Sequence, residues 1–264
     1  IRRKLIARFH NRIGPPVWQP FLDLRKLLEK GKSDSMGNDN AFFRFCPFLY
    51  FLSSFVLFLF IPFQIVSFQY DFILLVYITI LCSGFYVLVG FASNSPYGIV
   101  GSMREIITMV AYEMVLAASV FAFVIAANVT SFAAYPAGLN LMAAPLATVC
   151  MLFVVSIENK ITPFDTAEAE TEILHGYKTE FSARGLAWME LARQVKSAFF
   201  MFFLVFLLFG PIHIIWFAVA TLAFVFLFSL AKATTSRFRV DQVFKIYMPV
   251  LAVAVIEILR LVVF

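Results

Sequence analysis

The chain has 264 residues, of which 62% are hydrophobic and 14% are charged, against roughly 25% charged in an ordinary soluble domain. With 34 phenylalanines it carries more apolar surface than a soluble fold of this size could bury, so lipid must be the solvent for much of it. The apolar runs are continuous over about 20 residues, which excludes the short alternating strands of a β-barrel. We therefore expect one integral membrane domain, 1–264, with an all-α fold: a polytopic transmembrane helical bundle.

The first segment, 1–43, is rich in Lys and Arg and predicts a cytoplasmic loop that contains an amphipathic helix. Within 15–30, Phe21, Leu24 and Leu28 recur at helical spacing, and charged residues occupy the opposite face. A helix of this kind lies along the membrane interface rather than across it. It could serve as a lid on the bundle or as a docking platform for a soluble partner.

Seven apolar runs are long enough to cross a bilayer. Lys and Arg gather on alternate connectors, and the opposite connectors at 67–71, 128–139 and 210–213 contain none. By the positive-inside rule the basic side is cytoplasmic, so we expect a multi-pass protein of the cytoplasmic membrane. The expected spans are 44–66, 72–92, 106–127, 140–157, 188–209, 214–230 and 247–264.

The sequence lacks the usual signatures of bound cofactors and nucleic acid. Its three cysteines stand alone in apolar runs, its three histidines lie in separate connectors, and it has no glycine-rich nucleotide motif. The net charge of +5 comes from basic residues at span ends, which are a topology signal and meet anionic lipid. We expect lipid and no nucleic acid as a partner, no metal ligands or cofactor in this chain, and any redox centre in another chain.

Several carboxylates lie at membrane depth, where an ionisable group costs roughly 2.5–3.5 kcal/mol on insertion scales. Glu113 is deep in one span and Glu158 ends the next. At about 100° per residue, Glu105, Tyr112 and Ser119 share one stripe that Glu113 borders, and this stripe should face the bundle interior or water. Each acid could be buried and paired, but the set favours a proton or cation pathway, because such carboxyls can take up and release protons.

The acidic loop at 158–187 concentrates carboxylates in a chain that otherwise avoids them. Thr166 could cap a helix there, but Glu168 and Glu172 are four residues apart, and like charges so placed destabilise a helix. We interpret the loop as a charged funnel that leads into the bundle. The candidate proton path comprises Glu113, Glu158, Asp165, Glu168, Glu170, Glu172 and Glu180.

Short motifs along nearly the whole chain resemble one family. They are Arg12-Ile-Gly-Pro15, Gln19 through Leu27, Ser102-Met-Arg104, Ala111-Tyr-Glu113, Glu158 through Glu170, Tyr177 through Ser182, and Arg237 through Gln242. With these motifs the chain resembles the membrane protein that joins the two arms of complex I, called NuoH in bacteria, and its counterparts in membrane-bound NiFe hydrogenases. The resemblance implies one more transmembrane helix before Arg2, eight in all.

Two features are similar to the branch of membrane-bound NiFe hydrogenase and sulfane-sulfur reductase. Only three residues separate Gly14-Pro15 from Gln19-Pro20, where the quinone enzymes carry a longer insertion with glycine. Arg193 stands where quinone-reducing relatives usually have Glu, and Lys196 is similar to a lysine of the hydrogenase branch. The resemblance therefore implies that quinone is not an obligate substrate.

The resemblance also implies partners and residue roles. It places iron–sulfur clusters and a NiFe-type centre in partner subunits: an iron–sulfur small subunit and a NiFe-hydrogenase-like large subunit on the cytoplasmic face. Antiporter-like and small membrane subunits would complete the complex. The residues implied in coupling and docking are Arg104, Lys196, Arg237, Arg239 and Asp241.

We therefore expect an ion-translocating membrane subunit of a respiratory oxidoreductase complex, which couples electron transfer in a peripheral arm to the movement of H⁺ or Na⁺. One alternative is the quinone-binding subunit of an NADH- or ferredoxin-dependent quinone oxidoreductase. An alternative of another class is a standalone cation channel or exchanger that uses the same acids.

Overall fold

The computed structural model describes residues 1–31, 41–61, 67–165 and 176–263. Every regular element in these ranges is a helix, so the all-α prediction is confirmed. The elements are α1 (Arg2–Phe9), α2 (Gln19–Glu29), α3 (Ala41–Phe60), α4 (Asp71–Ala92), α5 (Pro96–Ala127), α6 (Pro145–Glu158), a 3-10 turn η1 (Gly176–Thr179), α8 (Ala183–Phe209), α9 (Ile214–Thr234) and α10 (Val240–Val263).

Six helices in the described ranges are long and apolar enough to cross a membrane, namely α3, α4, α5, α8, α9 and α10. The expected span 140–157 is wrong at its start, because α6 begins only at Pro145 and has 14 residues. Proline fits the first turn of a helix, where its missing N–H is not needed. At 1.5 Å per residue α6 covers about 21 Å, which is less than the ~30 Å hydrocarbon core, so it is a shorter apolar helix than the six candidate spans.

Three helices begin at least five residues before their expected spans, in segments interpreted as connectors. α5 starts at Pro96 instead of 106, α8 at Ala183 instead of 188, and α10 at Val240 instead of 247. These extensions carry charged residues, which lowered their apparent hydrophobicity in the sequence. In α5 the extra turns hold Glu105, which is buried and paired inside the bundle.

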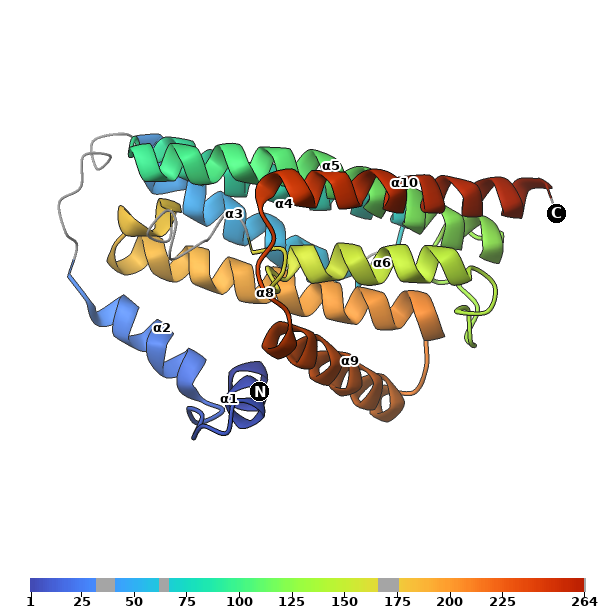
Figure 1. Ribbon diagram of the computed structural model, residues 1–264, viewed down its shortest axis with the longest axis horizontal. Coiled ribbons are helices and arrows are strands. Elements are labelled where there is room, and N and C mark those ends of the chain that lie inside the picture. The colour runs from blue at the N-terminus through green and yellow to red at the C-terminus, as the bar shows by residue number, and fades with distance from the viewer. Residues whose placement is uncertain (32–40, 62–66, 166–175, 264) are drawn as a thin grey trace.

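The long helices run side by side along the long axis of the molecule (Figure 1). α5 packs against α4, α6 and α10, while α8 packs against α3, α6 and α9. α8 supplies much of the core, with Phe199, Phe203 and Leu204 fully buried. α9 and α10 instead leave many large apolar side chains exposed, Trp216 and Val262 among them, as expected for faces that meet lipid or other membrane helices.

The first two helices lie at one edge of the bundle, with α1 against α9 and α2 against α8 (Figure 1). The amphipathic helix is confirmed, although it is shorter than the expected 15–30. Its Leu24 is half-buried, while Phe21 and Leu28 are exposed. Arg3 of α1 forms an ion pair with Asp23 of α2 at 3.1 Å, which joins the two short helices.

Candidate functional site: a buried polar cluster beside a cavity

Glu158 and Lys196 form a buried ion pair in the middle of the polar cluster. Lys196 Nζ of α8 lies 2.7 Å from Glu158 Oε2 at the end of α6, and both side chains are almost completely buried. The carbonyl end of a helix disfavours a negative charge, so Lys196 compensates both the burial of Glu158 and its position. The other carboxylate oxygen, Oε1, is buried and has no hydrogen-bond partner among the described residues.

Ser83 of α4 connects this pair to two residues of α5. Its hydroxyl accepts a hydrogen bond from Lys196 Nζ at 3.0 Å and from the Tyr112 hydroxyl at 3.2 Å. Glu113 lies within electrostatic range of Glu158 and Lys196, and its Oε1 is buried without a hydrogen-bond partner in the described part of the chain. Four helices thus bring two carboxyl groups to one lysine and one serine. We call Ser83, Tyr112, Glu113, Glu158 and Lys196 the polar cluster.

A second buried ion pair lies next to the polar cluster. Lys160 forms an ion pair with Glu105 of α5, and its ammonium group also lies 5.0 Å from the centre of the Tyr86 ring. Glu105 is 2% exposed. Tyr112 and Ser119, which share its stripe on α5, are fully buried, so the inward-facing stripe is confirmed. This pair balances the charge of a third carboxylate near the same four helices.

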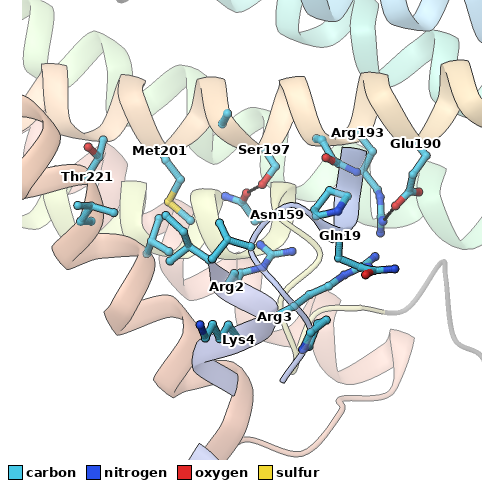
Figure 2. Close-up of a pocket in the computed structure, with 18 of the residues that line it drawn as sticks. Arg2, Arg3, Lys4, Gln19, Asn159, Glu190, Arg193, Ser197, Met201 and Thr221 are labelled. Atoms are coloured by element: carbon cyan, nitrogen blue, oxygen red, sulfur yellow. Dashed lines mark hydrogen bonds and ion pairs between the residues drawn. The ribbon is translucent and has the colours of Figure 1, made fainter. Parts of the chain in front are cut away.

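A cavity of about 430 Å³, whose lining is drawn in Figure 2, reaches the polar cluster at Glu158. Glu158 and Asn159 form part of its wall, beside Ser197 of α8. The Ser197 hydroxyl donates a hydrogen bond to Asn159 Oδ1, and Asn159 Nδ2 donates to the Val155 carbonyl at 2.8 Å. The cavity therefore provides a route from outside the bundle to a carboxylate that is itself buried.

Glu190 and Glu257 show the local pairing that their sequence positions allow. Glu190 forms an ion pair with Arg193, three residues further on, and lies 3.9 Å from Lys178. Arg260 lies 2.9 Å from Glu257, and it also donates a hydrogen bond to the Ala143 carbonyl at 2.8 Å. Glu190 lines the cavity, whereas Glu257 lies on α10, outside it.

The structure describes two of the five predicted loop residues. Asp165 lies 3.6 Å from Arg237, and this contact joins the segment after α6 to the segment before α10. Glu180 is half-buried just before α8. The predictions for Glu168, Glu170 and Glu172 fall outside the described residues.

The residues assigned to coupling and docking do not form one surface. Arg239 and Asp241 lie 3.9 Å apart and are well exposed, and Arg104 is half-buried on α5. Lys196 was grouped with these residues, but it is 6% exposed and belongs to the polar cluster. A long side chain on α8 reaches Glu158 because α6 and α8 pack together, which the sequence alone does not indicate.

Sequence reasoning missed Ser83, Asn159 and Lys160 as members of this region. Lys160 carried a signal, since it lies two residues after Glu158 in a family motif. Ser83 carried none, because one small polar residue in an apolar run usually bonds to its own helix. Its hydroxyl does donate to the Thr79 carbonyl at 3.0 Å, which leaves its oxygen free to accept from Lys196 and Tyr112.

The fold and the site define a polytopic helical membrane protein whose interior holds a charged cluster open to a cavity. The chain belongs to the NADH dehydrogenase family, whose model matches residues 1–263. It is 28% identical over 303 residues to the H subunit of NADH-quinone oxidoreductase from Orientia tsutsugamushi (strain Ikeda), covering 99% of this chain and 85% of that protein.

Two further comparisons agree with this family. The chain is 33% identical over 222 residues to "Hydrogenase-4 component C" of Escherichia coli (strain K12), covering 80% of this chain and 70% of that protein. Its fold is similar to a chain in the structure of the membrane-bound sulfane sulfur reductase, an archaeal respiratory membrane complex, with a TM-score of 0.88 at 21% identity. That match covers 98% of this chain and 92% of the other. The resemblance is confirmed, and the protein is a membrane subunit of a complex I- or hydrogenase-type oxidoreductase complex.

Proposed function

We propose that this chain passes protons from the cavity into the membrane interior through Glu158 and Glu113, as the ion-translocating subunit of a hydrogenase-type complex. The single observation that carries the proposal is the polar cluster itself. Two carboxyl groups from different helices, each with a buried oxygen that lacks a partner among the described residues, meet at one lysine–serine pair beside a cavity.

The chemistry of these groups suits stepwise proton transfer. Glu158 takes up a proton from the cavity, and the positive charge of Lys196 then becomes unbalanced. Lys196 can then pass a proton to Ser83 while the Ser83 hydroxyl gives its own proton to Glu113, and the proton on Glu158 restores the ammonium group of Lys196. Because two carboxylates and one ammonium group share the cluster, a proton on either carboxylate leaves one negative charge to balance Lys196.

The exit from Glu113 is lateral. Glu113 is half-buried, and its neighbours Val110 and Met114 on α5 are exposed. Further along α5, Leu116, Val120 and Phe123 are fully buried in apolar packing, which a proton cannot cross without water or polar groups. A proton on Glu113 therefore leaves sideways, to an antiporter-like or small membrane subunit that covers this face of α5.

Coupling to electron transfer runs through the cytoplasmic-side segments. The Asp165–Arg237 contact joins two such segments close to α6, so a shift of charge in a docked iron–sulfur or NiFe-hydrogenase-like subunit would change the field at Glu158. In this arrangement the clusters and the NiFe-type centre belong to those partners, and the basic connectors face the cytoplasm. The polar cluster suits the transfer of protons better than the binding of Na⁺. The ammonium group of Lys196 lies beside the carboxylates and would compete with a bound Na⁺ for their oxygens.

Replacement of Glu113 by Gln tests the path. Gln keeps the shape of the Glu side chain but cannot carry a proton, so the complex should still assemble. Proton uptake by sealed vesicles should fall by at least tenfold, because positioned proton-transfer groups commonly contribute ~10²–10⁴-fold to a rate. Glu29→Gln is the matched control, because Glu29 is exposed on α2 and pairs with Arg25. Undiminished uptake in the Glu113→Gln complex would reject the assignment.

A second candidate is quinone chemistry in the cavity. Two observations favour it. Pro15 and Pro16 of the short segment before α2, and Gln19 at the start of α2, line the cavity, and the relative from Orientia tsutsugamushi is named as a quinone oxidoreductase. This candidate predicts that extraction of quinone from the membranes abolishes electron transfer and that quinone-site inhibitors block it. Full activity in quinone-depleted membranes would exclude it.

A further inference from the structure

Glu105 and Lys160 form a buried ion pair that joins α5 to the segment after α6. Lys160 Nζ contacts both carboxylate oxygens of Glu105, and little of either side chain is exposed. The ammonium group also lies 5.0 Å from the centre of the Tyr86 ring of α4, an arrangement in which the ring attracts the cation. Within the described residues, the charge of Lys160 is therefore matched by that of Glu105.

Lys160 occupies a backbone position at which glycine is favoured. It follows α6 in the left-handed conformation, with a φ of 47°, and Ile161 N donates a hydrogen bond to the Ser156 carbonyl at 3.0 Å. Many helices end in this way, and the left-handed residue is most often glycine because glycine has no Cβ. The turn therefore does not account for a lysine at this position, whereas the contact of its ammonium group with Glu105 does.

Glu105 also lies in the same electrostatic environment as the polar cluster. Its carboxylate is within electrostatic range of Tyr112, Glu113 and Lys196. Glu105 and Glu113 are eight residues apart on α5, a rise of about 12 Å along the helix. Because buried charges are screened much less than exposed ones, a change of charge at Glu105 or at Lys160 alters the field at Glu113.

The polar cluster leaves one carboxyl group without a cation. Lys196 Nζ lies 2.7 Å from Glu158, and Glu113 Oε1 is buried with no hydrogen-bond partner among the described residues. Burial disfavours an ionised carboxyl group that has no counter-ion, and such a group takes up a proton instead. Lys160 is a second ammonium group beside these helices, but Glu105 already balances its charge.

The other titratable groups on the described helices around Glu113 do not supply this counter-ion. Thiol and phenol groups are uncharged at neutral pH, and those near the cluster are Cys82 and Tyr86 of α4, Tyr112 of α5 and Tyr247 of α10. The charged groups have other contacts or are exposed: Asp71 with two backbone amides, Arg104, Lys178 with Glu190, Glu257 with Arg260, and the exposed Lys245.

We propose that Glu105 is a positioning residue of the proton path: by balancing Lys160, it keeps Glu113 protonated in the resting complex. If Glu105 lost its charge, Lys160 would leave a net positive charge beside the polar cluster, and Glu113 would release its proton to solvent and stay ionised. A protonated Glu113 can deliver its proton sideways before Glu158 reloads it. The inference rests on the proposed function for the use of that proton, but the protonation of Glu113 can be observed without turnover.

The test is infrared spectroscopy of the complete complex in membranes at neutral pH. A protonated carboxyl group has a C=O stretching band that shifts in D₂O, and the band that Glu113→Gln removes from the wild-type complex belongs to Glu113. In Glu105→Gln the ratio of protonated to ionised Glu113 should fall about tenfold, the lower end of what a nearby charge does to a carboxyl group. The double variant E105Q/K160M removes both charges and should restore the band.

Glu257→Gln is the matched control. Glu257 is also a buried carboxylate paired with a basic residue, but its partner Arg260 bonds to Ala143 before the start of α6, whereas Glu158 lies at the end of α6. The Glu113 band should be unchanged in this variant. Lys160→Met acts in the opposite direction from Glu105→Gln, because Glu105 then has no counter-ion. A second band that shifts in D₂O should appear, and Glu113→Gln should not remove it.

Three results would overturn the proposal. They are the absence of a Glu113 band in the wild-type complex, an undiminished band in Glu105→Gln, and no recovery of the band in E105Q/K160M, which would show that Glu105 only supports the fold. If Glu105→Gln does not assemble, Lys160→Met decides: a second band supports the proposal, and its absence rejects it. Bands that behave as described, together with undiminished proton uptake in Glu113→Gln, would reject the proton path and leave the charge balance of Glu105 and Lys160 standing.

Discussion

Lys196 shows how one residue determines the state of the buried cluster. It contacts Glu158 at 2.7 Å and Ser83 at 3.0 Å, and it lies 5.8 Å from the centre of the Phe200 ring. Few other positive charges reach the described interior, and Lys160 is occupied by Glu105. Without Lys196, Glu158 would be a buried charge with no partner, which is far more costly than the loss of the pair as a whole.

The first prediction concerns this pair. Lys196→Met leaves Glu158 unpaired and should destabilise the protein by about 3–5 kcal/mol, seen as a lower midpoint of thermal unfolding of the purified complex. The double variant Glu158→Gln with Lys196→Met removes both charges and should recover most of the loss. Lys26→Met, on exposed α2, is the control for the substitution itself. Equal midpoints for the single variant and the wild type would show that the pair is not buried as described.

The approach of α4 to α5 depends on two glycines. A side chain at Gly90 would place Cβ 1.8 Å from Ser102 Oγ, and one at Gly98 would place it 2.0 Å from Ser93 Oγ. Because the two helices approach so closely, Ser102 Oγ of α5 donates a hydrogen bond to the Val87 carbonyl of α4 at 3.2 Å. This close contact sets the register at which Ser83 of α4 meets Tyr112 of α5, so the hairpin helps to build the polar cluster.

The second prediction therefore compares two glycines of the same helix. Gly90→Ala should destabilise the protein by about 1–3 kcal/mol, because Ser102 or the helix backbone must move. Gly84→Ala places its methyl group where no atom beyond the adjacent backbone of its own helix lies within 4 Å, and it should be neutral or slightly stabilising, as alanine is preferred in helices. Thermal unfolding of both variants measures the difference. Equal midpoints for the two would contradict the close contact.

At the scale of the whole molecule, the cavity and the polar cluster make only part of a path. The cavity reaches the cluster from one side, and Glu113 borders an exposed side of α5 rather than a water-filled opening at the far end. Tight apolar packing fills the described bundle beyond the cluster, with Val115 and Met151 fully buried. The proposed ion movement thus needs neighbouring subunits, as expected for a protein of this family.

The third prediction separates this proposal from a standalone cation channel. The chain reconstituted alone in liposomes should show no more proton flux under a membrane potential than empty liposomes do, whereas the complete complex should move protons when electrons are supplied. A flux through the isolated chain that Glu113→Gln removes would support the channel and reject the need for partners.

The sequence alone determined the membrane environment, most of the apolar helices, the amphipathic helix and the inward-facing stripe beside Glu113. These features follow from the local order of apolar and charged residues, because hydrophobicity and the cost of placing charge in lipid are properties of each segment by itself. Local spacing is enough to explain the contacts of Glu190 with Arg193 and of Glu257 with Arg260, which lie three residues apart on one helix. Only the tertiary structure decided that α6 is short, that Lys196 pairs with Glu158, and that Arg2 meets α8 across a cavity. The last two features join residues far apart in sequence, so they depend on which helices pack together. A sequence that is apolar along most of its length carries little information about that choice.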